Sequence, residues 1–208
     1  MPEYLSLFIV CLSAVFFVVD PLGVVPLFIA MTANDSPEKT RSMAARACLT
    51  GAGLLIFFAL FGGVMFKVMN ISLSAFRVAG GILLLITALD MLKARTSATR
   101  TSPEEKREGE LKDDIAIVPL AMPLLAGPGS IATVMVLMSK GETVWTAVPV
   151  VASIIITFVA SYFLLRAAKL VQRVLKASGV AILQRVMGLV LAAIAVQFMA
   201  EGARDLWK

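Results

Sequence analysis

The chain has 208 residues, of which 59% are hydrophobic and 16% are charged, and its mean hydropathy is +0.91. Soluble domains carry charge at about a quarter of their positions, so this composition excludes an ordinary soluble domain and indicates a multi-pass membrane protein. The net charge of +5 lies in the connecting loops, where it reports on membrane orientation and requires no nucleic-acid partner.

The first half of the chain contains three apolar stretches that we expect to cross the membrane. The first runs from Tyr4 to Ala33 and is interrupted by Asp20-Pro21-Leu22-Gly23. The second covers Ala47–Phe66, and the third covers Val78–Leu89. A span needs about 20 helical residues, and the third stretch reaches that length if the flanking Arg77 extends its side chain to the interface. Residues 1–92 are therefore predicted to form a unit of three spans.

A long polar stretch, residues 93–114, separates the two halves of the chain. Its threonines, serines, proline and closely spaced charges are typical of a solvated segment without a packed core. We expect this stretch to be a cytoplasmic linker.

The second half, residues 115–208, repeats the pattern of three spans. Its first stretch covers Ile115–Ser139 and is interrupted by Gly127-Pro128-Gly129. Thr143–Leu165 and Val186–Ala200 follow, the last of them lengthened by Arg185 at its edge. Between these two, basic residues at helical spacing predict a helical extension of the fifth span over anionic headgroups: Arg166, Lys169, Arg173 and Lys176.

The basic residues are distributed unequally between the two sides that six spans define. The loops after the first, third and fifth spans hold 14 of the 19 lysines and arginines, and the opposite side holds 5. Basic loops remain in the cytoplasm. We therefore expect both termini on the outer, periplasmic side of a bacterial cytoplasmic membrane.

The two halves resemble each other in sequence. Phe76–Leu92 and Gln184–Ala200 share six identities when Arg77 is aligned with Arg185, an offset of 108, whereas aligning Pro21 with Pro128 requires an offset of 107. Because each half has an odd number of spans, the second copy must be inverted relative to the first. The predicted fold is thus an all-α membrane protein with two inverted three-helix repeats, in which spans 1 and 4 are discontinuous. Such repeats are common in secondary transporters, with the binding site between them.

The two interruptions are the candidate binding site. A membrane helix can break only where protein or a polar cavity satisfies its backbone groups. Pro21 and Pro128 suit the first turn of a new half-helix, whose free N–H groups attract an anion such as a carboxylate. A carboxylate at Asp20 is able to receive an ammonium group. The predicted ligand is a small zwitterion held by two segments, Asp20-Pro21-Leu22-Gly23 and Gly127-Pro128-Gly129-Ser130.

Two polar residues within the spans leave alternatives open. Asp20 either caps the second half-helix or binds substrate or a coupling proton or sodium ion, since an intramembrane carboxylate is a functional candidate. Gln197 lies in the sixth span, where it either joins helices or contacts substrate.

The sequence argues against an enzyme. It contains no histidine, so the usual general base and a common metal ligand are missing, and no cofactor or metal is expected. It also has no ATP-binding loop of the Gly-x4-Gly-Lys-Ser/Thr type, so uphill transport requires a coupled ion.

The motifs resemble those of the MarC family of bacterial inner-membrane proteins. Asp20 to Phe28 is similar to the first-span signature of that family, and Pro119 to Ile131 is similar to its fourth-span signature. Arg77 to Gly81, Arg185 to Gly188 and Ile194 to Gln197 resemble its third- and sixth-span motifs. The resemblance implies six spans in two inverted repeats, and transport of small neutral amino acids such as glycine and alanine. This chain has Val24 where many relatives carry a polar residue.

The leading hypothesis is therefore a secondary transporter of small neutral amino acids that works by alternating access. Its expected partners are the amino acid, membrane lipids and a coupling proton or sodium ion, and a homo-oligomer is compatible with the sequence. The alternative is a non-transporting accessory protein linked to multidrug resistance, or a protein of drug or metabolite efflux.

Overall fold

The computed structural model describes residues 2–93, 116–139 and 144–207. Apart from Lys93, the predicted linker 93–114 lies outside these ranges. Every regular element within them is a helix, in the order α1 (Pro2–Val19), α2 (Pro21–Met31), α3 (Pro37–Met69), α4 (Leu73–Leu92), the π-helix η1 (Ala116–Leu125), α6 (Pro128–Ser139), α7 (Val144–Arg166) and α8 (Ala168–Leu206).

Five helical segments in the described part of the chain are long and apolar enough to cross a membrane. They are Tyr4–Met31, Pro37–Met69, Leu73–Leu92, Ala147–Arg166 and Ser178–Leu206. The first of them contains α1 and α2, so it includes the predicted interruption. The predicted fourth span is divided into η1 and the 12-residue α6. The all-helical, multi-pass class is confirmed, and the count of six spans stays a prediction.

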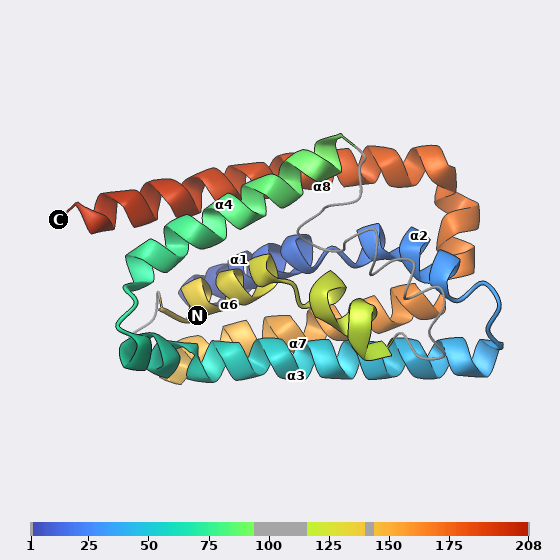
Figure 1. Ribbon diagram of the computed structural model, residues 1–208, viewed down its shortest axis with the longest axis horizontal. Helices are drawn as coiled ribbons and strands as arrows, with labels where there is room; N and C mark the ends of the chain where they lie inside the picture. The colour runs from blue at the N-terminus through green and yellow to red at the C-terminus, as the bar shows by residue number, and fades with distance from the viewer. Residues whose placement is uncertain (1, 94–115, 140–143, 208) are drawn as a thin grey trace.

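The helices form three layers (Figure 1). Helix α3 packs along α7 in one outer layer, and α4 packs along α8 in the other. The interrupted helices α1–α2 and η1–α6 lie between these pairs and contact both of them. The two helix breaks are thus enclosed by continuous helices, which is where unpaired backbone groups are tolerated in a membrane.

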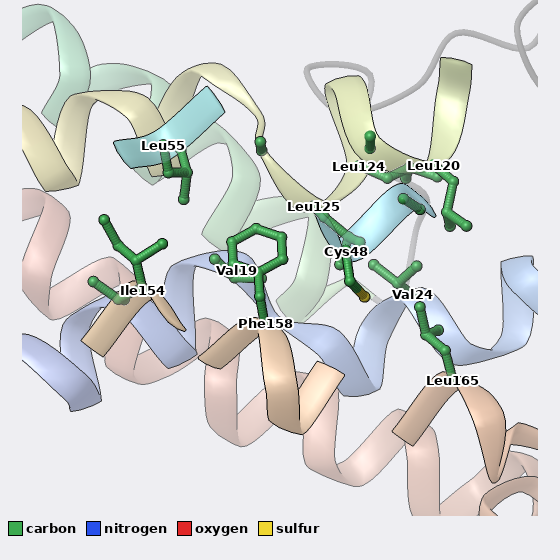
Figure 2. Close-up of a cluster of buried hydrophobic side chains, with 14 of the residues drawn as sticks. Val19, Val24, Cys48, Leu55, Leu120, Leu124, Leu125, Ile154, Phe158 and Leu165 are labelled. Atoms are coloured by element: carbon green, nitrogen blue, oxygen red, sulfur yellow. The ribbon is translucent and has the colours of Figure 1, made fainter. Parts of the chain in front are cut away.

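The larger core lies between the middle layer and the α3–α7 pair (Figure 2). Val19 next to the first break and Leu125 next to the second are both completely buried there. Gly51 of α3 lies against the ring of Phe158 of α7, and a Cβ atom at Gly51 would be 2.6 Å from Cε1 of that ring. Close approach at a small residue is the usual way in which membrane helices pack.

The second core joins α4 and α8 to the middle layer, and it has a regular internal spacing. Buried residues of α4 have buried counterparts in α8 that lie 107 positions later in the sequence: Leu191 for Leu84, Ala195 for Ala88, and Phe198 for Met91. The glycines follow the same offset. A Cβ at Gly81 would lie 2.9 Å from the Ala195 carbonyl oxygen, and one at Gly188 would lie 3.0 Å from the Ala88 carbonyl oxygen.

The predicted basic extension after the fifth span is helical but bent. Helix α7 ends at Arg166, α8 begins at Ala168, and Lys176 inside α8 has φ 53° and ψ 177°. The chain turns at these two points across one end of the bundle (Figure 1). No Pro or Gly stands at either bend. The spacing of the basic residues therefore predicts the helix but not its bends.

Candidate functional site: two helix breaks beside a small cavity

The first break is a single left-handed residue between α1 and α2. Asp20 has φ 50° and ψ 60° and is 1% exposed. Its backbone N–H donates to the Phe16 carbonyl at 3.0 Å and so ends α1. Its carboxylate Oδ1 accepts the Gly23 N–H at 3.1 Å and so begins α2. The expectation that Asp20 caps the second half-helix is met by this geometry.

The sequence around Asp20 fits this local structure. Aspartate and asparagine enter the left-handed region more readily than most residues. Pro21 occupies the first helical turn, where its missing N–H and fixed φ are favourable. A Cβ atom at Gly23 would collide with the Asp20 carboxylate, so glycine at this position lets the carboxylate fold over the start of α2. Asp20 and Gly23 therefore depend on each other.

The second break, between η1 and α6, is closed by different groups. The π-helical pattern ends with the Ala126 N–H donating to the Ala121 carbonyl at 2.9 Å. The Ser130 hydroxyl donates to the Leu125 carbonyl at 3.3 Å and so bridges the break. Pro128 begins α6, as Pro21 begins α2. A wide π-turn beside a break is unusual, and π-bulges occur frequently at functional sites.

A small cavity lies against the second break. Its space open to the centre of a water-sized sphere is about 20 Å³, which holds about one water molecule. It is lined by the segment Gly127–Ser130 together with Val18, Leu83, Leu84, Thr87 and Leu124. Because Gly129 has no side chain, α6 approaches α4 closely: a Cβ there would lie 2.8 Å from Leu84 Cδ2.

The structure brings part of the predicted site together. Gly127, Pro128, Gly129 and Ser130 all line the cavity. Near the first break, the cavity is lined by Val18, which lies two residues before Asp20. A Cβ atom at Gly129 would lie 3.9 Å from Val18 Cγ1. The cavity is not lined by the other predicted site residues of the first break, which follow Val18 closely in sequence: Asp20, Pro21, Leu22 and Gly23.

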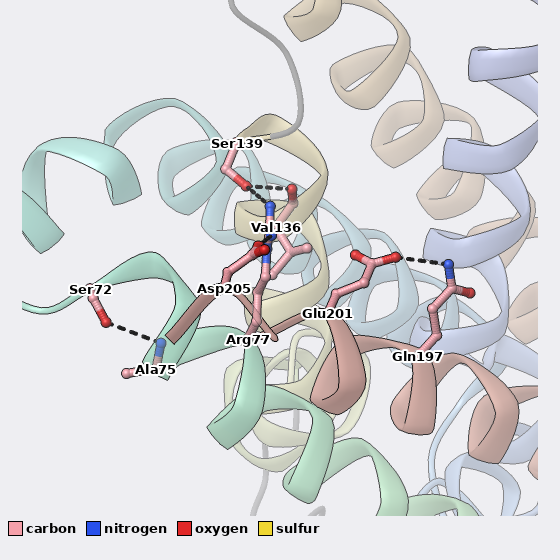
Figure 3. A network of polar contacts seen from close by, with 8 residues as sticks. All are labelled: Ser72, Ala75, Arg77, Val136, Ser139, Gln197, Glu201 and Asp205. Carbon is pink, nitrogen blue, oxygen red and sulfur yellow. Dashed lines mark hydrogen bonds and ion pairs between the residues drawn. The ribbon is translucent and has the colours of Figure 1, made fainter. Parts of the chain in front are cut away.

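Gln197 is not brought to the breaks. It is exposed on α8, and its Nε2 donates to Glu201 Oε1 at 2.9 Å, one turn further along the same helix (Figure 3). The partner that a polar residue in a span requires is therefore a neighbour on its own helix.

Sequence reasoning missed Thr87. This residue of α4 is 6% exposed, lines the cavity, and donates its hydroxyl to the Leu83 carbonyl at 3.0 Å. A signal for it exists, because Thr87 is the one side chain with a hydrogen-bonding group between Arg77 and Asp90. Within the described residues, no group of three or more Cys, Asp or Glu side chains is arranged to hold a metal ion.

Layers of long apolar helices around two enclosed breaks define an integral, multi-pass membrane protein. The pattern of the MarC family of integral membrane proteins matches residues 5–207, so the chain belongs to this family. It is 40% identical to a UPF0056 membrane protein of Methanocaldococcus jannaschii, over 96% of this chain and 97% of the relative. Identity is 34% with a UPF0056 membrane protein of Aquifex aeolicus, over 100% and 97% of the two chains. It is 30% with YhcE of Escherichia coli K12, over 99% and 94%. No solved structure matches the chain.

Proposed function

We propose that this protein is a secondary transporter of small neutral amino acids in the cytoplasmic membrane, working by alternating access between two inverted repeats. The observation that carries the proposal is the pair of enclosed helix breaks. Val18, near the end of α1, and Gly127–Ser130, at the second break, line the same cavity. Paired discontinuous helices of this kind commonly hold the substrate of a repeat-built transporter.

The chemistry of the breaks favours a zwitterion. The first turn of α6 begins at Pro128 and directs positive partial charge toward the cavity side, which suits a carboxylate. The hydroxyls of Ser130 and Thr87 line the cavity and donate their protons to the Leu125 and Leu83 carbonyls, so their oxygens are left as acceptors there. Asp20, at the other break, supplies the negative charge for an ammonium group or for a coupling proton or sodium ion. In this geometry its Oδ1 accepts the Gly23 N–H at 3.1 Å.

The cavity as it stands is smaller than any amino acid. Sites for drug-sized ligands have volumes of about 300–1,000 Å³. The cavity at the second break has room for about one water molecule, so the two breaks must separate before even glycine can enter. Apolar walls made by Val18, Leu83 and Leu84 restrict how far such a site opens.

Reciprocal contacts support the inverted repeat. Gly81 contacts Ala195, and Gly188 contacts Ala88. Gly188 lies 107 residues after Gly81, and Ala195 lies 107 residues after Ala88, so the two contacts join equivalent positions of the two halves. Two antiparallel helices with such contacts are related by a two-fold axis perpendicular to them, which for membrane helices lies in the membrane plane. Gly51 and Phe158 have the same offset and contact each other, as residues on that axis do.

Under the proposed repeat, these glycine contacts favour an offset of 107 for the third and sixth spans over the offset of 108 given by the sequence identities. The six identities at an offset of 108 align Arg77 with Arg185, whereas an offset of 107 makes Gln184 the equivalent of Arg77. The packing offset equals the separation of Pro21 and Pro128.

Uptake into proteoliposomes tests the proposal. The purified full chain is reconstituted, a proton or sodium gradient is imposed, and entry of radiolabelled glycine, alanine and serine is measured. We expect gradient-dependent uptake by the wild type. Gly129→Leu fills the cavity and pushes α6 from α4, so it should reduce uptake to the level of empty liposomes.

The matched control is Gly53→Leu, because a Cβ at Gly53 meets nothing within 4 Å. It adds the same side chain to a membrane helix and should leave uptake unchanged. Failure of the wild type to move any of the three amino acids under either gradient would overturn the proposal. Equal uptake by the Gly129→Leu protein would remove these breaks from the transport path.

A further inference from the structure

A second, larger groove lies away from the helix breaks, at the end of the bundle where α3 turns into α4. The space open to the centre of a water-sized sphere is about 650 Å³, within the range of ligand sites. Helix α3 forms one wall, the last turn of α6 forms another, and the turn Asn70–Ser72 closes its end. No function described above uses this groove.

The groove is apolar along most of its length and polar at one end. Gly63 lies in its α3 wall, where a Cβ would meet nothing within 4 Å, and Met135 and Met138 of α6 face it. Lys67, Asn70 and Ser72 form the polar end. A ligand that fills the groove must therefore combine a hydrocarbon chain with a hydrogen-bonding head.

The polar end is suited to an anion. The Lys67 ammonium makes no ion pair with any residue that the structure describes, and Lys67 and Asn70 are both exposed. The backbone of Asn70 ends α3, with φ 54° and its N–H donating to the Lys67 carbonyl at 3.3 Å, and the residue lines the groove. The Ser72 hydroxyl accepts the Ala75 N–H at 3.1 Å as it begins α4 and retains its own proton to donate.

The position of the groove selects a lipid over a water-soluble ligand. Its α3 wall continues into a face of exposed apolar side chains, with Val64 60% and Val68 81% exposed, which in a membrane helix contact hydrocarbon. Lys67 directly follows the predicted span Ala47–Phe66, so the polar end is expected at the level of the headgroups. We propose that this groove binds one anionic phospholipid, its phosphate at Lys67 and Asn70 and one acyl chain along Gly63 between α3 and α6.

Such a lipid would lie against α6, the half-helix that begins at the second break. Met135 and Met138 are on the groove side of α6, and the side chain of Met135 also contacts α3 at Gly62. Flexible methionine side chains adapt to an occupant of variable shape. The binding claim does not depend on transport, because the groove and the cavity at the breaks have no lining residue in common.

Native mass spectrometry of the delipidated full chain tests the site. Phosphatidylglycerol and phosphatidylcholine with identical acyl chains are added separately, and the Kd of the first bound lipid is measured. We expect tighter binding of phosphatidylglycerol by the wild type. Lys67→Gln should weaken that binding about fivefold, the contribution of one lysine near an anionic headgroup. Asn70→Gly keeps the left-handed backbone and removes the amide, so it should weaken binding without unfolding the turn.

The acyl-chain part is tested by Gly63→Leu, which fills the groove and should abolish this site for both lipids, with Gly53→Leu as control. Lys39→Gln, at the opposite end of α3, should leave the measured Kd unchanged, because the Lys39 ammonium is already paired with Asp35 at 2.7 Å. Equal affinity for the two lipids, or an unchanged Kd in the Lys67→Gln protein, overturns the proposal. Glycerol 1-phosphate binding as tightly as phosphatidylglycerol, or displacement of the lipid by glycine or alanine, would also overturn it, in favour of a phosphate site or an amino acid vestibule.

Discussion

Substitutions of Asp20 separate the two means by which this residue holds the first break. Its carboxylate caps α2 through the Gly23 N–H at 3.1 Å, and its backbone adopts φ 50°. Asp20→Ala loses the cap, which costs about 1 kcal/mol, and leaves a left-handed alanine, which costs about 1 kcal/mol more. Asp20→Gly loses the cap but tolerates the backbone, at a cost of a few tenths of a kcal/mol. Asp20→Asn retains an acceptor and a tolerant backbone, so its free energy of unfolding should be close to wild type.

Equilibrium unfolding in mixed detergent micelles, followed by circular dichroism as the fraction of dodecyl sulfate is raised, measures these differences. The expected order of stability is wild type, then Asn, Gly and Ala, with about 2 kcal/mol lost by the alanine variant. Ser36→Ala is the matched control, because Ser36 caps α3 at 3.2 Å with an ordinary φ of −64°. It should lose about 1 kcal/mol. An Asp20→Ala protein as stable as the glycine variant would refute the argument from left-handed strain.

The Asp20→Asn protein also tests ion coupling, because it removes the charge and retains the cap. Under the proposed function it should lose gradient-driven uptake in proteoliposomes while folding normally. Full gradient-driven uptake would contradict a coupling role for Asp20 and would leave its capping role intact.

Further substitutions probe the contact between α4 and α8 and the bend inside α8. Arg77 of α4 contacts Asp205 of α8 at 2.9 Å and also Ser139 at 3.4 Å (Figure 3), so Arg77→Met should cost about 2 kcal/mol of unfolding free energy. A double-mutant cycle with Asp205→Asn in the same detergent titration should give a coupling of about 1 kcal/mol, and strict additivity would argue against the pair. Lys176→Gly should stabilise the protein by about 1 kcal/mol, because φ 53° with ψ 177° is a conformation essentially confined to glycine. A lower midpoint for this variant would contradict that reasoning.

The helix breaks could be predicted from sequence because their causes are local. Pro21 and Pro128 each remove a backbone donor, and the flanking glycines and Asp20 supply the conformations and the cap that a new helix needs. These effects act within four residues of each break. The positions of both breaks were therefore correct.

Features that depend on packing between distant segments were not predicted. Thr87 reaches the cavity because α4 lies across α6, which the sequence of α4 alone does not encode. Gln197 was placed in the site because a polar residue in a span needs a partner, yet Glu201 on the same helix provides it. The bend at Lys176 has no Pro or Gly to announce it.

Under the proposed transport function, the reciprocal contacts of Gly81 with Ala195 and of Gly188 with Ala88 would affect the energetics of the cycle. In a carrier whose two halves exchange conformations, the Gly81–Ala195 contact of one form would become equivalent to the Gly188–Ala88 contact of the other. The α4–α8 interface would then contribute equally to the free energies of the inward-open and outward-open forms. The α4–α8 interface would therefore favour neither the inward-open nor the outward-open form. The direction of net movement would then be set by solute concentrations and by the energetics of the Asp20 carboxylate, which has no counterpart at Gly127.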